Sequence, residues 1–134
     1  MKILVTGDRE WSDRETMLGY LSGIRDKITC LVHGDCRGAD KMADRIVRSW
    51  GVKSISYPAE WDLYGKAAGV MRNSQMLQEN LDIELVLAFH TNIEKSRGTK
   101  DMIEKARKRS IPVVLVTGLE IVEYNPVIKG FFRI

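Results

Sequence analysis

The sequence predicts a doubly wound α/β fold, built on a mainly parallel sheet of five strands with helices on both faces. Two observations carry this prediction. Five short apolar runs rich in strand-forming residues recur along the chain, and each of the first four is followed by a segment with helical character. Because a parallel connection needs a crossover, strands that alternate with helices are typical of a parallel sheet covered on both faces.

The expected strands end in loops that we predict to form a binding site. In the spatial order 3-2-1-4-5, the strand order reverses between the first and the fourth strand, and such sheets bind ligands beyond the carboxyl ends of the strands at that point. The loops of interest are therefore residues 7–11, 34–38, 58–65 and 90–98. The strands themselves are expected at residues 2–6, 28–33, 52–57, 83–89 and 112–117.

The helical segments differ in how clearly their ends are marked. The first has Ser12 three residues before Glu15, which is the spacing of a capping box. The second begins near Ala39 with apolar residues on one face, and Gly51 follows it at the position expected of a C′ residue. Weaker helical patterns cover residues 66–79 and 99–110.

The length of 134 residues predicts one domain, spanning residues 1–134. The tail, residues 118–134, has no helical period, and its apolar end predicts packing on the domain or on a partner subunit, which makes a homo-oligomer one expectation. No apolar run approaches the roughly 18 residues of a spanning helix, and no signal peptide is recognised. Cys30 and Cys36 lack a CxxC spacing and are predicted to be free thiols. We therefore expect a cytoplasmic protein with no membrane partner.

The charge of the chain is concentrated in one segment. With 21 basic and 18 acidic residues the formal net charge is +3, and the basic excess lies within residues 94–109. Clustered Lys and Arg side chains can bind the phosphates of a nucleic acid. They also suit the last turns of a helix, where cations meet the negative end of the helix dipole. One solvated helix face accounts for most of these charges, so nucleic acid is the less favoured partner.

The first strand leads into residues suited to an anionic ligand. Gly7 follows Thr6 at the strand exit, where the backbone can approach a ligand, and Arg9 can meet a phosphate. The chain has neither GxGxxG nor a complete P-loop, so the standard dinucleotide and Walker-type ATP sites are disfavoured.

Two later loops place glycines directly before a helix. Gly34 and Gly38 precede the second helix, whose first N–H groups would form a phosphate cradle. The alternative is a plain glycine turn with Asp40 as a first-turn acid favoured by the helix dipole. Gly98 and Thr99 repeat the arrangement after the fourth strand, with Thr99 as a helix cap or a phosphate donor.

The segment after the third strand carries aromatic and donor groups. Trp61 and Tyr64 offer flat faces for a base, or they form lids over the edge of the core. Arg72 and Asn73 offer hydrogen-bond donors to a ligand, or Arg72 pairs with a surface acid.

Four ordered motifs of this chain together resemble one known family. They read Val-Thr-Gly-Asp-Arg-Glu-Trp (5–11), Val-His-Gly-x-x-Arg-Gly-Ala-Asp (32–40), Pro-Ala-x-Trp-x-x-Tyr-Gly-x-Ala-Ala-Gly-x-x-Arg-Asn-x-x-Met (58–76) and Arg-Gly-Thr-x-Asp-Met (97–102). The set is similar to the YspA-like branch of the SLOG superfamily, named for Smf/DprA and Lonely Guy proteins, over about residues 3–116. The resemblance implies a Rossmann-like fold, the binding of nucleotides or their derivatives, and roles in phage and bacterial conflict.

The resemblance also implies where a ligand binds and where catalysis is in doubt. Lonely Guy hydrolases, which cleave the N-glycosidic bond of nucleoside monophosphates, carry Pro-Gly-Gly-x-Gly-Thr-x-x-Glu with a catalytic Glu. Here the leading proline is missing and Met102 stands at the position of that Glu. Asp101 is adjacent, but one residue of a helix turns a side chain by roughly 100°. The ligand-binding residues that the resemblance implies are Gly7, Arg9, His33, Gly34, Arg37, Gly38, Asp40, Arg72, Asn73, Gly98 and Thr99.

Other side chains in the crevice loops could supply chemistry. A carboxylate can stabilise the oxocarbenium character that builds on the sugar, and an acid can protonate the departing base. The candidates are Asp8, Glu10, Asp40 and His33. Cys36 would act as a nucleophile only with His33 close and well oriented. No metal-ligand spacing is found, so neither a metal nor a cofactor is expected.

These observations favour one function over two others. The leading hypothesis is a protein that binds a nucleotide or a nucleotide-derived molecule, as a sensor or a sequestering protein. Its phosphates would lie on the two helix N-termini, with Arg9, Arg37 and Arg72 neutralising charge and Trp61 or Tyr64 near the base. The alternatives are an N-glycosidic hydrolase of a nucleotide and a single-stranded DNA module like the DprA relatives.

Overall fold

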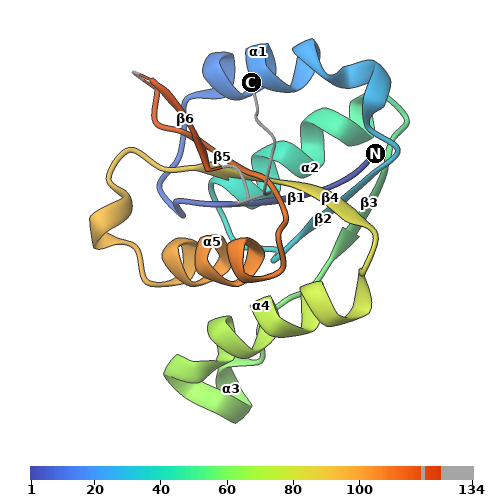
Figure 1. Cartoon of the computed structure of the whole chain (residues 1–134). Helices are drawn as coiled ribbons and strands as arrows, with labels where there is room; N and C mark the ends of the chain where they lie inside the picture. The colour runs from blue at the N-terminus through green and yellow to red at the C-terminus, as the bar shows by residue number, and fades with distance from the viewer. Residues whose placement is uncertain (119, 125–134) are drawn as a thin grey trace, which may run out of the picture.

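The computed structural model describes residues 1–118 and 120–124, and its centre is a mostly parallel six-stranded sheet (Figure 1). The strand order is β3-β2-β1-β4-β5-β6, so the order 3-2-1-4-5 predicted for the first five strands is confirmed. These five strands are parallel to one another, whereas β6 is antiparallel to β5. The strands are β1 (Lys2–Gly7), β2 (Cys30–His33), β3 (Lys53–Ser56), β4 (Ile83–Phe89), β5 (Val113–Val116) and β6 (Ile121–Tyr124).

The predicted number of five strands is wrong by one. The additional strand, β6, lies in the tail and alternates exposed with half-buried side chains, Ile121 being 56% exposed. An edge strand of this kind lacks the continuous apolar run that marks a parallel strand buried on both faces. The part of the tail that is described thus packs on the sheet, and residues 125–134 lie outside the described residues.

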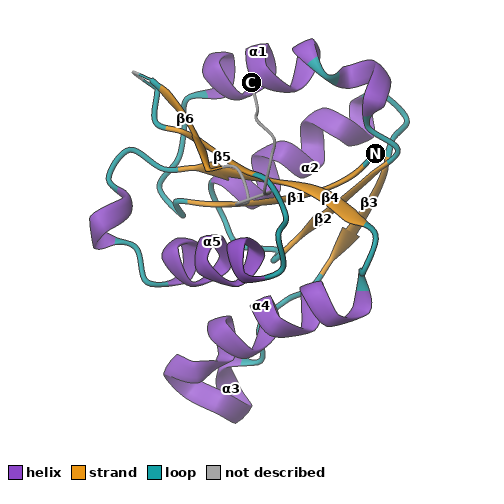
Figure 2. Cartoon of the chain, in the orientation of Figure 1, coloured by secondary structure: helices purple, strands orange, loops and turns teal. Residues whose placement is uncertain are grey.

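Helices lie against both faces of the sheet (Figure 2). On one side are α1 (Arg14–Gly23) and α2 (Ala39–Ser49), and on the other are α4 (Ala68–Glu79) and α5 (Gly98–Lys108). The short helix α3 (Trp61–Tyr64) lies in a segment that we expected to be a loop, and it precedes α4. Single 3-10 turns occur at Arg25–Lys27, Gly65–Ala67 and Ile93–Lys95.

The central strands separate two hydrophobic cores. Ile3 and Val5 of β1 belong to the core shared with α1 and α2, whereas Leu4 between them belongs to the core shared with α4 and α5. All three side chains are fully buried. Because successive residues of a strand point to opposite faces, β1 must be apolar at every position, and this continuity is what made it recognisable in the sequence.

Local side chains and glycines determine where the first two helices begin and end. The N-cap of α1 is Asp13 rather than Ser12, because Asp13 Oδ1 accepts a hydrogen bond from the backbone N–H of Thr16 at 3.1 Å. The hydrogen bonds from Thr16 lower the pKa of Asp13 and keep the cap ionised. Gly51 follows the C-cap of α2 with φ of 77°, so its predicted C′ role is confirmed.

Candidate functional site

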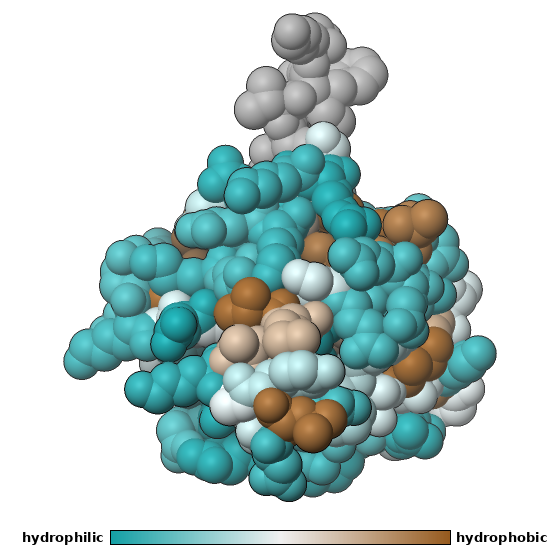
Figure 3. Space-filling model, turned by 90° about the horizontal axis from the view of Figure 1, so that it is seen from below, coloured by the Kyte–Doolittle hydropathy of each residue, from teal (hydrophilic) through white to brown (hydrophobic). Residues whose placement is uncertain are grey.

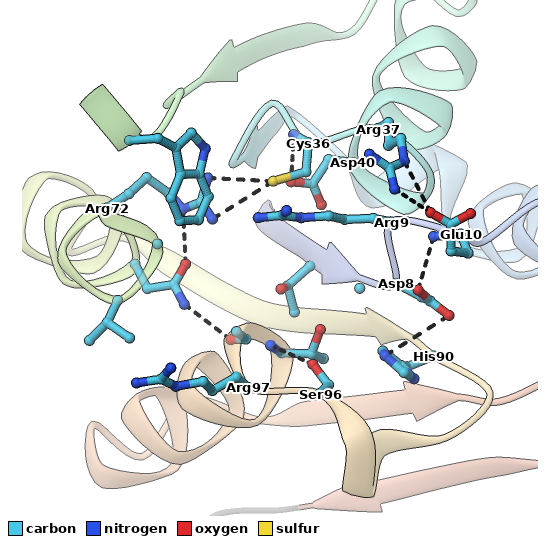
Figure 4. A pocket seen from close by; sticks show the side chains of 18 of the residues that line it. Asp8, Arg9, Glu10, Cys36, Arg37, Asp40, Arg72, His90, Ser96 and Arg97 are labelled. Carbon is cyan, nitrogen blue, oxygen red and sulfur yellow. Dashed lines mark hydrogen bonds and ion pairs between the residues drawn. The ribbon is translucent and has the colours of Figure 1, made fainter. Parts of the chain in front are cut away.

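A cleft of about 490 Å³ lies at the carboxyl ends of β1 and β4, where the strand order reverses (Figure 4). Asp8 follows β1 and His90 follows β4, and the N–H of Asp8 donates to the carbonyl of Phe89 at 2.9 Å. The parallel pairing of β1 with β4 therefore brings the carboxylate of Asp8 and the imidazole of His90 to the same edge of the sheet.

Most of the predicted site residues line this cleft, but some lie elsewhere. The predicted residues around the cleft are Thr6, Gly7, Asp8, Arg9, Glu10, Arg37, Asp40, Trp61, Arg72, Asn73, Gly98 and Thr99. The predicted residues that lie outside its lining are His33, Gly34, Gly38 and Tyr64.

His33 is buried beneath the β2–α2 loop with both ring nitrogens occupied. Its Nε2 lies 3.1 Å from Asp44 Oδ1, and its Nδ1 accepts a hydrogen bond from the N–H of Asp35 at 3.0 Å. An Nδ1 that accepts a hydrogen bond places the ring proton of a neutral imidazole on Nε2, toward the Asp44 carboxylate. His33 is thus a structural group of the loop, and no bond joins it to Cys36, whose Sγ contacts the Gly34 carbonyl and Arg72.

Two N–H groups of the β2–α2 loop and the N–H of the first residue of α2 are used within the chain. Oδ2 of Asp40 accepts from the N–H of Gly34 at 3.0 Å and from that of Cys36 at 3.2 Å. The N–H of Ala39 donates to the carbonyl of Asp8 at 3.0 Å. The phosphate cradle predicted at this helix N-terminus is therefore occupied by the protein's own carboxylate and carbonyl groups.

Burial changes the acidity of Asp40. The side chain lines the cleft yet is only 5% exposed, and this burial raises its pKa from 3.8 to about 6. The backbone N–H groups that it accepts from, together with the charge of the Arg72 guanidinium group, oppose the rise without cancelling it. Asp40 is therefore a cleft carboxyl group that changes protonation state close to neutral pH.

The N-terminus of α5 forms the opposite wall of the cleft. The hydroxyl of Ser96 accepts from the N–H of Thr99 at 2.9 Å, so the capping role that we predicted for Thr99 belongs to Ser96. Asn73 Nδ2 donates to the carbonyl of Gly98 at 3.1 Å and ties α4 to this wall. Within residues 1–118 and 120–124, the N–H of Gly98 has no hydrogen-bond partner and remains free to meet an anion.

Arg72 joins α4 to the β2–α2 loop. Its Nη1 donates to the carbonyls of Gly34 at 2.5 Å and of Tyr57 at 3.3 Å, and its Nε donates to Asn73 Oδ1 at 3.0 Å. The alternative of a pair with a surface acid is wrong, because Arg72 is buried and its partners are mostly backbone carbonyls. In the described chain Nη2 contacts only Cys36 Sγ, at 3.9 Å, which leaves this nitrogen available to a ligand.

Arg9 and Trp61 meet across one side of the cleft. The guanidinium carbon of Arg9, from the β1–α1 loop, lies 4.9 Å from the ring centroid of Trp61 in α3. Trp61 is 43% exposed, and a Cβ on Gly69 would lie 3.2 Å from its indole ring. One ring face is thus covered by Arg9, and a base that stacks on that face has to displace or share the guanidinium group.

Several polar contacts lie at the rim of the cleft and at the ends of β1 and β4. Arg37 and Glu10 form an exposed ion pair with an Nη2 to Oε1 distance of 2.5 Å, and this contact raises the pKa of Arg37. Asp8 Oδ1 accepts from the N–H of Glu10 at 2.9 Å, while its Oδ2 lies 4.0 Å from His90 Nε2. The His90 ring is oriented by the N–H of Asn92, which donates to Nδ1 at 3.0 Å.

Several cleft residues were not assigned to the site from the sequence. They are Lys66, Gly69, Val70, Ser96 and Arg97. Ser96 and Arg97 stand next to the predicted Gly98, so their position before a helix start was an available signal. Lys66 and Val70 carried no such signal, because it is the packing of α4 that brings them to the cleft.

The cleft carries more positive than negative groups. Five cationic side chains and three carboxyl groups line it, which favours an anionic ligand. The described residues contain no group of three His, Cys, Asp or Glu side chains that could hold a metal ion. They also contain no helix with both the length and the apolar character needed to cross a membrane.

The fold and the cleft define a mainly parallel α/β protein with a site at the reversal of strand order. The YspA, cpYpsA-related SLOG family matches residues 1–64. The chain is also 35% identical over 123 residues to the Gene 61 protein of Mycobacterium phage D29. This alignment covers 84% of this chain and 94% of the phage protein. The chain therefore belongs to the YspA, cpYpsA-related SLOG family, as its motifs predicted. No solved structure matches it.

Proposed function

We propose that this protein binds a nucleotide or a nucleotide-derived small molecule in the cleft, as a sensor or a sequestering protein. The observation that carries the proposal is the excess of cationic side chains around a cleft at the strand-order reversal of the sheet. In a doubly wound, Rossmann-like sheet this is the place where nucleotides bind. Membership of a SLOG family independently suggests nucleotide-related binding or processing.

The ligand's phosphate is assigned to the α5 side of the cleft. The N–H of Ala39 at the start of α2 and two N–H groups of the loop before it are used within the chain, whereas α5 offers the N–H of Gly98 with Arg97 beside it. Lys66 lines the same cleft and adds a third cationic or donor group. With the phosphate at α5, we propose that the base lies toward Trp61 and Arg9, on the side of α3.

Binding is tested with a panel of nucleoside mono-, di- and triphosphates, ADP-ribose, NAD and cyclic nucleotides, read by thermal shift and calorimetry. A ligand present at 100 times its Kd raises the free energy of unfolding by about 2.7 kcal/mol. We expect Arg97→Ala to weaken binding about tenfold or more, because a charge-assisted hydrogen bond is lost.

The matched control is Lys108→Ala, an exposed cation in the last turn of the same helix. This variant should bind as the wild type does. A wild-type protein that binds no compound of the panel and carries no co-purified ligand would overturn the proposed function. An equal loss of binding affinity in both variants would show that the whole helix, rather than the cleft, attracts the anion.

A second candidate function, hydrolysis of an N-glycosidic bond, is favoured by the carboxylate of Asp8 facing His90 in the cleft. The position of the Lonely Guy Glu does not support it, since Met102 is fully buried in the core. Asp101 is also committed, because its Oδ2 accepts from Asn73 and from Lys105. Released base or ribose phosphate after incubation, abolished by Asp8→Asn, would establish this activity, and an unchanged ligand would exclude it for that compound.

A further inference from the structure

The carboxyl group of Asp40 is held on one oxygen and unpartnered on the other. Oδ2 accepts two backbone hydrogen bonds, from Gly34 and Cys36. Among the described residues, Oδ1 has no hydrogen-bond partner, although the residue is only 5% exposed. Asp40 lines the cleft next to Cys36 (Figure 4). A buried oxygen without a partner is uncommon, and here it belongs to a side chain that lines the cleft, so it is available to a bound ligand.

The charged and titratable groups around Asp40 come from four elements. Arg72 of α4 acts on it through its charge, the His33 imidazole of β2 lies beneath the same loop, and the backbone N–H of Cys36 in the β2–α2 loop donates to it. The β1–α1 loop packs against the start of α2 and contributes Asp8 and Arg9 to the same cleft. Arg72 is already shared among carbonyl oxygens, so none of these groups neutralises Asp40 by a direct ion pair within the described chain.

We propose that Asp40 is a ligand-binding residue that, as a neutral carboxylic acid, donates a hydrogen bond from Oδ1 to an anionic oxygen of the bound ligand. The proposal rests on the proposed function, because it needs an anion in this cleft. A second negative charge in the cleft disfavours an ionised carboxylate, so binding the anion draws a proton from solvent onto Asp40. Burial already raises the pKa of Asp40 to about 6, which makes this protonation readily accessible at neutral pH.

The inference is tested by isothermal titration calorimetry with ADP-ribose, NAD and cyclic AMP. Their phosphates are diesters or bridged esters and keep a constant charge between pH 5.5 and 8, so any proton that is exchanged belongs to the protein. Titrations in two buffers with different ionisation enthalpies give the number of protons taken up. We expect uptake approaching one proton per ligand above pH 6, and an affinity that falls toward tenfold per pH unit as the pH rises.

Asp40→Asn distinguishes a donor from a structural carboxyl group. The Asn carbonyl oxygen can accept the same two N–H bonds, and its amide nitrogen donates at every pH. We expect this variant to bind at pH 8 at least as tightly as the wild type, with no proton uptake and no pH dependence. The matched control Asp26→Asn removes an exposed carboxylate far from the cleft and should leave the uptake unchanged.

Three results would overturn the inference, and they are distinguishable from failure of the proposed function. Wild-type binding without proton uptake means that Asp40 only holds the loop. Uptake that persists in Asp40→Asn assigns the proton to another group, His90 being the cleft residue to test next. Failure of all three probes to bind overturns the inference for diester ligands, while the remaining nucleotides of the panel still decide the proposed function.

Discussion

Asp40 and Arg72 are buried charged side chains whose partners are mainly backbone groups. Asp40 accepts from two loop N–H groups, and Arg72 donates to two loop carbonyls, including that of Gly34. A Cβ on Gly34 would collide with the Arg72 guanidinium group, which explains the glycine there. These two residues hold the loop against α4 and shape the floor of the cleft.

The buried state of Asp40 makes stability depend on pH. Its folded pKa of about 6 lies above the unfolded value of 3.8, so its contribution is fully present below pH 3.8 and is lost as the pH rises through 6. The loss amounts to about 3 kcal/mol. The Asp40→Asn variant has no charge to bury. Chemical denaturation should therefore show that its free energy of unfolding rises relative to that of the wild type by up to this amount between pH 3.5 and 7. A pH-independent difference would contradict the assigned pKa.

Arg37 stands at the rim of the cleft, where its pair with Glu10 is exposed to solvent. Exposed ion pairs add little to stability because water screens them. We expect Arg37→Ala to weaken nucleotide binding while the melting temperature stays unchanged, as measured by calorimetry and thermal denaturation. Equal affinity in this variant would remove Arg37 from the binding residues.

Among the elements that surround the cleft, the loop between β2 and α2 shows why one glycine is required. Gly38 has φ of 79° and ψ of −123°, and a Cβ there would collide with the carbonyls of Asp8 and Arg9. This close approach is what allows Ala39 to donate to the carbonyl of Asp8 and joins the β1–α1 loop to α2. Gly38 therefore acts on the cleft through backbone packing, although it does not line it.

Replacing two glycines of similar φ separates backbone strain from steric conflict. Gly51 has φ of 77°, but no heavy atom lies within 4 Å of the position that a Cβ would take, so Gly51→Ala should cost about 1 kcal/mol in unfolding free energy. Gly38→Ala adds the collision with two carbonyls and should cost at least twice as much. Urea denaturation of both variants measures the difference, and equal losses would show that the loop moves to accommodate the methyl group.

In the molecule as a whole, the basic segment around residues 94–109 is largely engaged in internal contacts. Lys105 binds Asp101 and the carbonyl of Val70, Arg109 donates to the carbonyl of Leu77, and Arg107 lies over the ring of Tyr124. These contacts bear out the interpretation of the segment as the end of a helix, with basic residues in the last turn of α5.

We therefore expect weak binding to single-stranded DNA. Fluorescence anisotropy with a labelled oligothymidine should show little binding at low salt, and less than the nucleotide affinity of the cleft. Tight DNA binding with a steep salt dependence, and no response to mononucleotides, would instead support the DNA-binding alternative.

The surface on the side of α3 and α4 is mostly hydrophilic with separate apolar areas (Figure 3). The exposed large apolar side chains of these helices are Trp61, Leu63, Tyr64 and Met71.

The apolar tail predicted a homo-oligomer, and sedimentation equilibrium tests this prediction directly, with an expected mass that is a multiple of 15.3 kDa. A mass of one chain at micromolar concentration would overturn it. A cytoplasmic location and a role in phage or bacterial conflict likewise stay predictions.

The alternation of apolar strand segments with helical segments was enough to predict the parallel strands, and the strand order of a doubly wound fold then gave the edge of the sheet where the cleft lies. Buried parallel strands need continuous apolar runs, and β1 and β4 have them. The motifs shared with the family also led us to predict Gly7, Arg9 and Arg72, and all three line the cleft. The strand β6 was missed, because an edge strand needs no such run.

How the predicted site residues are used depends on tertiary packing. His33 and Asp40 belong to one motif, yet the imidazole is enclosed with Asp44 while the carboxyl group lines the cleft. The same loop uses its own N–H groups on Asp40, and for this reason we propose the anion site at α5 instead. Burial and hydrogen-bond partners come from packing between elements distant in sequence, and no local pattern encodes them.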